Sequence, residues 1–187
     1  MSTPSAARLI DAPIAYLAGP EVFLPNAMEI GAEKIAICRA HGIDALFPFE
    51  DTQRDGATAA DRGHALFLDC VEMMERCNLG IVNMTPFRGV SMDVGTAVEL
   101  GYMHARGHPV FGYTNVTLDY EARVSDESMA VEAFQFVDNL MCEGPIWRSG
   151  GSVVRTHVDP GDLYTDLRGF TRCVEQAATL LGVAPPR

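Results

Sequence analysis

Short apolar runs alternate with helix-like segments along most of this chain. The apolar runs cover residues 14–18, 44–47, 79–84 and 108–113, and the helix-like segments cover residues 26–41, 59–76 and 94–106. Parallel strands need a long crossover connection, which is usually a helix, so this alternation is typical of a parallel α/β sheet. We therefore expect an α/β fold with a mainly parallel sheet of about five strands.

The pattern is less regular after residue 113. Residues 114–127 are polar, and we predict a helix over residues 129–140 and an amphipathic helix over residues 163–181. Between these helices lies a glycine-containing stretch in which Val153 and Val154 are compatible with a short further strand. No internal repeat, linker or low-complexity block divides the chain, so we interpret residues 1–187 as one domain. We expect residues 1–12 to be a short mobile lead-in and residues 50–58 to run over the surface.

The charge of the chain argues against several classes of partner. Fourteen basic residues against twenty-five acidic ones give a formal net charge of −11. Such a surface repels a phosphate backbone and an anionic membrane, so we expect neither nucleic acid nor membrane partners. No apolar run reaches the length of a membrane span, and the N-terminus has no signal-peptide pattern.

The cysteines and histidines favour a reduced protein without a metal. The five cysteines are odd in number and scattered, and without a signal peptide we interpret them as free thiols of a cytoplasmic protein. No CxxC pair occurs, and the five histidines do not cluster. We therefore expect no metal site.

Two acidic residues follow the apolar run at residues 79–84. Asp93 comes directly before the helix-like segment, and Glu99 lies six residues further on. In an open parallel sheet, ligands bind beyond the carboxyl ends of the strands. Two carboxylates there, with no basic residue between them, suggest acid and nucleophile chemistry. The alternative is that Asp93 is only an N-cap and Glu99 only a solvated helix residue.

The first strand also ends in a loop that suits a ligand. Gly19 stands at its carboxyl end, where a missing side chain lets a ligand approach the backbone. The chain has neither a GxGxxG fingerprint nor a P-loop, and the acidic Glu21 disfavours a phosphate cradle. Tyr16 and Phe23 offer a hydroxyl and an aromatic face to a flat ligand, the alternative being ordinary core packing.

Several segments together resemble a known enzyme family, the nucleoside 2-deoxyribosyltransferases. The matching segments are residues 16–23, residues 71–78, residues 83–89, residues 93–101 with the pattern DxGTxxExG, and residues 138–141. They occur in the family's order and span most of residues 14–142. The resemblance implies a flavodoxin-like or Rossmann-like three-layer sandwich. It also implies exchange of the base on a 2′-deoxynucleoside, as in nucleotide salvage, with free purine or pyrimidine bases as the other substrate.

The resemblance also implies roles for single residues. Glu99 matches the nucleophilic glutamate, Asp93 the acid that assists the departing base, and Tyr16 the tyrosine that helps to hold the nucleophile. Asn139 matches an asparagine that a neighbouring subunit contributes to the sugar's 5′-hydroxyl, and Met141 lies beside it in the same matching segment. A homo-oligomer with shared active sites follows, and no cofactor is required.

The remaining substrate contacts are expected on the first loop and on the helix before the second matching segment. Gly19 and Phe23 belong to the matching loop. The family often has an aspartate or asparagine where this chain has Cys70, so our candidate for base recognition is the neighbouring Asp69, the alternative being that this role is lost. Asn78 replaces a common aspartate, which we interpret as a structural change at a strand entrance.

Two other functions compete with base exchange. A hydrolase of the same superfamily would give the sugar of a nucleoside or nucleoside 5′-monophosphate to water, and Arg88 is then a candidate for the phosphate. A non-catalytic nucleotide-binding module on the same fold is the second alternative, because a fold does not determine a function. The presence of both Asp93 and Glu99 argues against the binding module.

Overall fold

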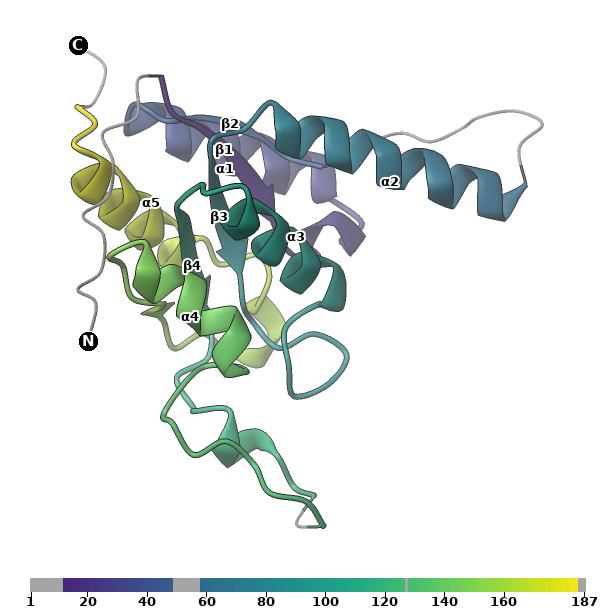
Figure 1. The fold of residues 1–187 in the computed structure, drawn as a ribbon, viewed down its shortest axis with the longest axis vertical. Coiled ribbons are helices and arrows are strands. Elements are labelled where there is room, and N and C mark those ends of the chain that lie inside the picture. The colour runs from purple at the N-terminus through teal and green to yellow at the C-terminus, as the bar shows by residue number, and fades with distance from the viewer. Residues whose placement is uncertain (1–11, 49–57, 127, 185–187) are drawn as a thin grey trace.

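A computed structural model describes residues 12–48, 58–126 and 128–184 of the chain (Figure 1). Its strands are β1 (Ile14–Ala18), β2 (Asp44–Leu46), β3 (Leu79–Asn83), β4 (Val110–Thr114) and β5 (Val154–Arg155). Its α-helices are α1 (Ala27–Ala40), α2 (Ala59–Glu75), α3 (Val94–Ala105), α4 (Leu140–Arg148) and α5 (Arg168–Leu181). Short 3-10 helices are η1 (Pro20–Phe23), η2 (Glu121–Arg123) and η3 (Pro160–Asp162).

The five strands form one parallel sheet in the order β2-β1-β3-β4-β5. This is the order of flavodoxin-like doubly wound folds. Asn78, directly before β3, helps to align β3 with β1, because its Oδ1 accepts a hydrogen bond from the backbone N of Ile14 at 2.8 Å. The predicted parallel α/β sheet is confirmed, and Asn78 has the structural place at a strand entrance that the sequence suggested.

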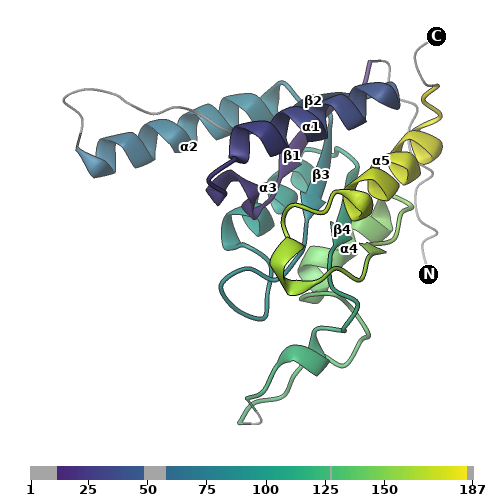
Figure 2. The same cartoon turned by 180° about the vertical axis from the view of Figure 1, so that it is seen from behind.

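Helices cover both faces of the sheet. Helices α1 and α5 lie on one face, whereas α3, α4 and the C-terminal part of α2 lie on the other (Figures 1 and 2). Successive residues of a strand point to opposite faces. In β1, Ala15 and Leu17 therefore pack with the α1 and α5 core, while Tyr16 and Ala18 pack with the α3 and α4 core.

The strand order creates a switch point between β1 and β3. The chain leaves β1 through η1 and α1 toward β2, and it leaves β3 through α3 toward β4 in the opposite direction. The two connections diverge at the carboxyl ends of these neighbouring strands, which is where open α/β sheets bind ligands. The first turn after β1 and the start of α3 therefore face the same crevice.

The predicted helix over residues 129–140 is wrong. Residues 115–126 and 128–139 instead form an arm that extends from the body beyond the carboxyl end of the sheet (Figure 1). Its two limbs are joined by a hydrogen bond from the backbone N of Tyr120 to the carbonyl oxygen of Phe136 at 2.7 Å. Arg155 fastens both limbs by donating to Asp119 Oδ1 at 2.5 Å and to the carbonyl oxygen of Gln135 at 2.7 Å. These tertiary bonds outweigh the local helical pattern.

Other boundaries differ in smaller ways. Helix α4 begins at Leu140 and runs into the glycine-containing stretch, where no helix was predicted. Helix α5 begins at Arg168 rather than at residue 163. The expectations for residues 1–11 and 49–57 lie outside the described residues. Among the described helices, none is both long and apolar enough to cross a membrane.

Candidate active site

A cavity of about 140 Å³ lies at the switch point between β1 and β3. Its walls come from the loop after β1, from the start of α3, and from single residues near β2 and on α2. The lining residues are Gly19, Val22, Phe23, Pro48, Cys70, Asp93, Gly95, Thr96 and Glu99. Four residues singled out from the sequence, Gly19, Phe23, Asp93 and Glu99, therefore share one cavity.

Tyr16 and Glu99 form the shortest polar contact of this site. The hydroxyl of Tyr16 donates a hydrogen bond to Glu99 Oε1 at 2.6 Å. Tyr16 is fully buried in β1, and its ring points to the face of the sheet that α3 covers. The bond occupies Oε1, so the second carboxylate oxygen of Glu99 does not take part in it.

The surroundings of Glu99 disfavour its charged form. Burial raises the pKa of Glu99 to about 7, the Tyr16 hydrogen bond lowers it, and the nearby Asp93 charge raises it. Burial also raises the pKa of Tyr16 far above its usual range, and the charge of Glu99 adds to that effect, so Tyr16 remains a donor. A half-buried carboxylate of this kind is poised between acid and nucleophile near neutral pH.

Asp93 has the N-cap geometry that its position predicted. Its Oδ2 accepts hydrogen bonds from the backbone N of Thr96 at 2.9 Å and from Thr96 Oγ1 at 3.1 Å. Both bonds fall on Oδ2, so Oδ1 carries neither of them. Because Asp93 also lines the cavity, the cap and a role toward a ligand are compatible.

Gly19 has a reason to be glycine that the sequence alone did not indicate. A Cβ atom at this position would lie 2.1 Å from Glu21 Oε2 and 2.9 Å from the Cβ of Asn83. The space beside Gly19 is therefore filled by the protein's own carboxylate rather than kept open for a ligand. The expected acidic loop is also corrected, because Glu21 is fully buried and does not present its charge at the surface.

Glu21 belongs to a buried polar network under the site. Its Oε1 accepts hydrogen bonds from Lys34 Nζ at 2.8 Å, from Asn83 Nδ2 at 3.1 Å and from the Tyr113 hydroxyl at 2.6 Å. Burial raises the pKa of Glu21, but the Lys34 ammonium and these bonds outweigh it, so that the pKa lies below the usual value. The Lys34 ammonium is itself buried, 4.7 Å from the centre of the Phe170 ring. The network ties η1 to α1, β3 and β4.

Cys70 rather than Asp69 reaches the cavity from α2. Cys70 lines the cavity, and its thiol is close enough to Tyr16 to raise the pKa of that tyrosine further. Asp69, one position earlier on the helix, is not among the lining residues. The sequence also missed Val22, Gly95 and Thr96, although the last two lie within the DxGT pattern and were detectable there as the first turn of a helix.

Asn139 and Met141 do not lie in this chain's own cavity. Asn139 caps α4, with its Oδ1 accepting from the backbone N of Met141 at 2.9 Å. Its Nδ2 donates to Glu132 Oε1 at 2.6 Å. The Met141 side chain is 72% exposed. The adjacent Asp138 fastens this segment to the loop before α3, because its Oδ2 accepts from the backbone N of Met92 at 2.7 Å.

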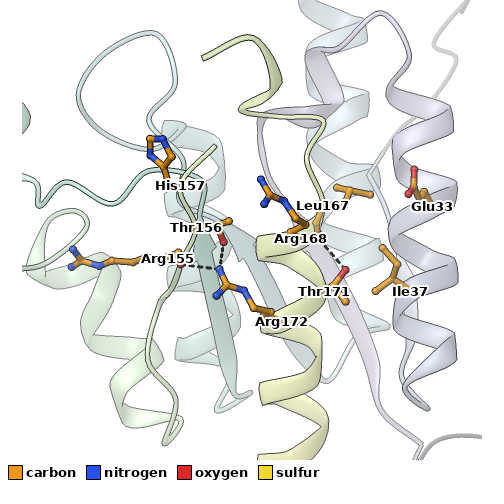
Figure 3. Close-up of a pocket in the computed structure, with 9 residues that line it drawn as sticks. All are labelled: Glu33, Ile37, Arg155, Thr156, His157, Leu167, Arg168, Thr171 and Arg172. Atoms are coloured by element: carbon orange, nitrogen blue, oxygen red, sulfur yellow. Dashed lines mark hydrogen bonds between the residues drawn. The ribbon is translucent and has the colours of Figure 1, made fainter. Parts of the chain in front are cut away.

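A cavity of about 820 Å³ lies elsewhere, between α1, α5 and the end of β5 (Figure 3). Three arginines border it. Arg155 is paired with Asp119, and Arg168 is paired with Asp166 at 2.6 Å. Arg172 turns toward β5, where it donates to the carbonyl oxygen of Arg155 at 2.9 Å. Two of the three arginines therefore pair with the protein's own carboxylates, and the third donates to the protein's own backbone.

No metal-binding cluster stands out in the part of the chain that the structure describes, since no three His, Cys, Asp or Glu side chains gather there. The polar side chains gathered at the switch point include Tyr16, Asp93 and Glu99. Retaining glycosidases in general use a pair of carboxyl groups, one as nucleophile and one as acid.

Comparisons with known proteins identify the family and the fold. The family model for nucleoside 2-deoxyribosyltransferases matches residues 15–141. An uncharacterized protein of Schizosaccharomyces pombe is 34% identical over 171 residues, which cover 75% of this chain and 80% of that protein.

Two solved structures show the same fold. A 2-desoxiribosyltransferase from Leishmania mexicana matches with a TM-score of 0.60 and 24% identity, over 87% of this chain and 97% of its own. A conserved protein from Enterococcus faecalis matches with a TM-score of 0.51 and 19% identity, over 89% of this chain and 99% of its own. At these identities the two structures support the fold alone.

Proposed function

The chain belongs to the nucleoside 2-deoxyribosyltransferase family, and on that basis we propose that it exchanges the base of 2′-deoxynucleosides through a covalent intermediate on Glu99. The observation that carries the proposal is the 2.6 Å hydrogen bond from Tyr16 to Glu99 inside a cavity that Asp93 also lines. The free bases and 2′-deoxynucleosides are the substrates.

The proposed reaction is a double displacement at the anomeric carbon. The free oxygen of Glu99 forms a bond to C1′ while the bond from C1′ to the base breaks, through an oxocarbenium-like transition state. The Tyr16 hydroxyl stays on the other oxygen and orients the carboxyl group. Proton donation on the Asp93 side lets the base leave neutral. A second base then attacks C1′ from the side that the first one left, which releases Glu99 and retains the configuration.

Glu99 must be ionised to attack, and its pKa of about 7 makes this possible at neutral pH. The same elevated pKa signals that the carboxylate is incompletely solvated, which makes it a better nucleophile. A substrate without a 2′-hydroxyl forms the developing cation more easily, which supports deoxynucleosides over ribonucleosides.

We propose that a second copy of the chain completes the site. The cavity of about 140 Å³ is smaller than the roughly 300 Å³ or more of ordinary small-molecule sites. In its own chain, Asn139 lines no part of the cavity, and the neighbouring Leu140 and Met141 are exposed. A partner that places its Asn139 at the sugar's 5′-hydroxyl would supply the missing wall.

The first experiment is base exchange itself. The protein is incubated with thymidine and adenine, and the products are separated by liquid chromatography. Base exchange predicts deoxyadenosine and free thymine. Thymine with free deoxyribose and no deoxyadenosine would instead identify a nucleoside hydrolase. If no reaction occurs, other combinations of nucleoside and base and deoxynucleoside monophosphates are tested, and only a lack of reaction with all of them supports a binding module.

The shared site is tested by mixing two inactive variants. Glu99→Gln lacks the nucleophile, and Asn139→Ser keeps a cap for α4 but lacks the amide. If each site uses Asn139 of the partner, a mixture of the two variants regains activity, because some sites combine an intact Glu99 with an intact Asn139. Full activity of Asn139→Ser alone, or of a protein that sediments as a monomer at the assay concentration, would contradict the proposal.

A further inference from the structure

The aromatic rim of the cavity is built in layers. Phe23 lines the cavity from η1 and is 55% exposed. Its ring stacks on Phe87, from the loop between β3 and α3, with centroids 5.3 Å apart and planes 8° from parallel. This distance lies in the range that aromatic pairs prefer. The stack holds an otherwise exposed ring in one orientation.

Phe87 is fixed from its other sides. The ring of Tyr164 meets it edge to face, with centroids 5.9 Å apart and planes at 83°. The Tyr164 hydroxyl donates to the carbonyl oxygen of Pro86 at 2.5 Å, which anchors the start of the same loop. The backbone N of Phe87 donates to the carbonyl oxygen of Ser91 at 2.9 Å and closes the loop. Phe87 is therefore a firm support for Phe23.

Arg88 completes the rim. Its guanidinium carbon lies 4.6 Å from the Phe87 ring centre and 5.0 Å from the Phe23 ring centre. Within the part of the chain that the structure describes, no carboxylate pairs with it. Its φ of 55° is in the left-handed region, which costs a non-glycine residue energy. Arg88 thus combines a guanidinium over the two rings with a strained backbone conformation.

We propose that Phe87 and Arg88 are positioning residues that hold Phe23 as the stacking surface for the nucleobase, and so set the affinity for flat heteroaromatic bases. This inference rests on the proposed function, because it takes the base as the ligand of the cavity. One face of Phe23 is covered by Phe87, so the base stacks on the remaining ring surface at the cavity. Neither Phe87 nor Arg88 lines the cavity that contains Glu99.

The two residues therefore act on binding rather than on bond cleavage. Replacing Phe87 by leucine keeps an apolar side chain but removes the parallel ring, so Phe23 gains freedom that the bound base must remove again. An aromatic pair contributes enough for about a threefold to tenfold change in affinity. Arg88→Gln removes the charge over the rings, and we expect about a twofold to threefold loss.

The test separates binding from turnover. Phe87→Leu, Phe87→Tyr, Arg88→Gln and the control Val90→Ala on the same loop are placed in the Glu99→Gln background. Calorimetry with thymidine and with adenine then gives the dissociation constants. The same four substitutions in the active chain give KM and kcat for base exchange.

We expect Phe87→Leu to raise the dissociation constant and KM for both ligands by the stated factor, with kcat within about twofold of the parent. Phe87→Tyr restores binding, and Val90→Ala changes nothing. A fall in kcat with unchanged dissociation constants would overturn the inference, as would unchanged binding in both Phe87→Leu and the more exposed Arg88→Gln. If the parent binds bases but exchanges none, a weaker binding in Phe87→Leu still supports the inference while the proposed function fails.

Discussion

Two glutamates at the same edge of the sheet have opposite environments. Glu21, after β1, is fully buried and accepts hydrogen bonds from a lysine, an asparagine and a tyrosine. Glu99, on α3, accepts one from Tyr16 and has the negative Asp93 nearby. The pKa of Glu21 is lowered, whereas that of Glu99 is raised to about 7.

The difference shows what each carboxylate is available for. The charge of Glu21 is neutralised by a buried ion pair with Lys34, which joins η1 to α1. Hydrogen bonds join the same carboxylate to two strands. Such a pair is weak evidence for stability by itself, but breaking it leaves an uncompensated buried charge. Among the residues that the structure describes, no cation pairs with Glu99, so its charge is available for an electron-poor carbon. The first glutamate builds the site, and we propose that the second one reacts.

The largest expected effect comes from replacing Glu99, the glutamate that we propose to react. Glu99→Gln keeps the shape of the side chain but cannot form the glycosyl ester, so we expect kcat for base exchange to fall by about 10³-fold or more. The initial rate of deoxyadenosine formation from thymidine and adenine measures it. Thymidine binding by calorimetry is the control and should survive. An exchange rate within about tenfold of the parent would exclude Glu99 as the nucleophile.

Replacing Lys34, the cationic partner of Glu21, is expected to lower the stability of the protein instead. Lys34→Met leaves Glu21 buried without its partner, and we expect a loss of about 3–5 kcal/mol in the free energy of unfolding. Urea denaturation measures it. The double variant Glu21→Gln with Lys34→Met should recover much of that loss, because no unpaired charge remains. If the single variant unfolds at the same urea concentration as the parent, the ion pair is not structural.

Tyr16→Phe tests the environment of Glu99 directly, because it removes the hydrogen bond that the Tyr16 hydroxyl donates to Glu99. A hydrogen bond to a charged group contributes about 1.5–3 kcal/mol, so we expect kcat to fall about tenfold to a hundredfold. The Tyr16 bond lowers the pKa of Glu99, so its loss raises that pKa further. The acid limb of the rate profile, which we expect near pH 7 in the parent, should therefore move to higher pH. An unchanged limb would mean that Glu99 does not titrate in the reaction.

The smallest expected effect is on the pH dependence of stability. Because the folded pKa of Glu99 is above its unfolded value, its favourable contribution is complete below about pH 4.5 and is lost as the pH rises through about 7. Glu99→Gln removes the ionised form that is costly in the folded state. Its melting temperature should therefore exceed that of the parent at pH 8 by more than at pH 5. A constant difference across this range would argue against the raised pKa.

Much of the site could be predicted from the sequence, because it depends on patterns within short segments. The apolar run of β3, the N-cap at Asp93 and the position of Glu99 one turn and a half along α3 all depend on neighbouring residues. Tyr16 and Phe23 were singled out by their place around the carboxyl end of the first strand and by a matching segment. Cys70 was not among the candidates, because it stands where the family often has an aspartate or asparagine and the neighbouring Asp69 was the candidate for that role.

The arm shows where local patterns mislead. Residues 129–140 have enough apolar periodicity to predict a helix, yet Arg155 and Tyr120 hold them as an extended limb. Arg155 stands 20 positions from Gln135, and Tyr120 stands 16 positions from Phe136, so neither contact belongs to the local helical pattern. The helix that does form begins only at Leu140, where Asn139 provides the cap.

The sequence by itself determined the alternation of strands and helices up to β4, the parallel sheet and the position of two acids at the start of one helix, because these follow from periodicity and capping within a few residues. Only the tertiary structure decided which glutamate is neutralised. Lys34 stands 13 residues from Glu21, Tyr113 stands 92 residues from it, and Tyr16 stands 83 residues from Glu99. A carboxylate's pKa depends on the charges and donors that folding brings within a few ångströms, and these distances exist only in the folded chain.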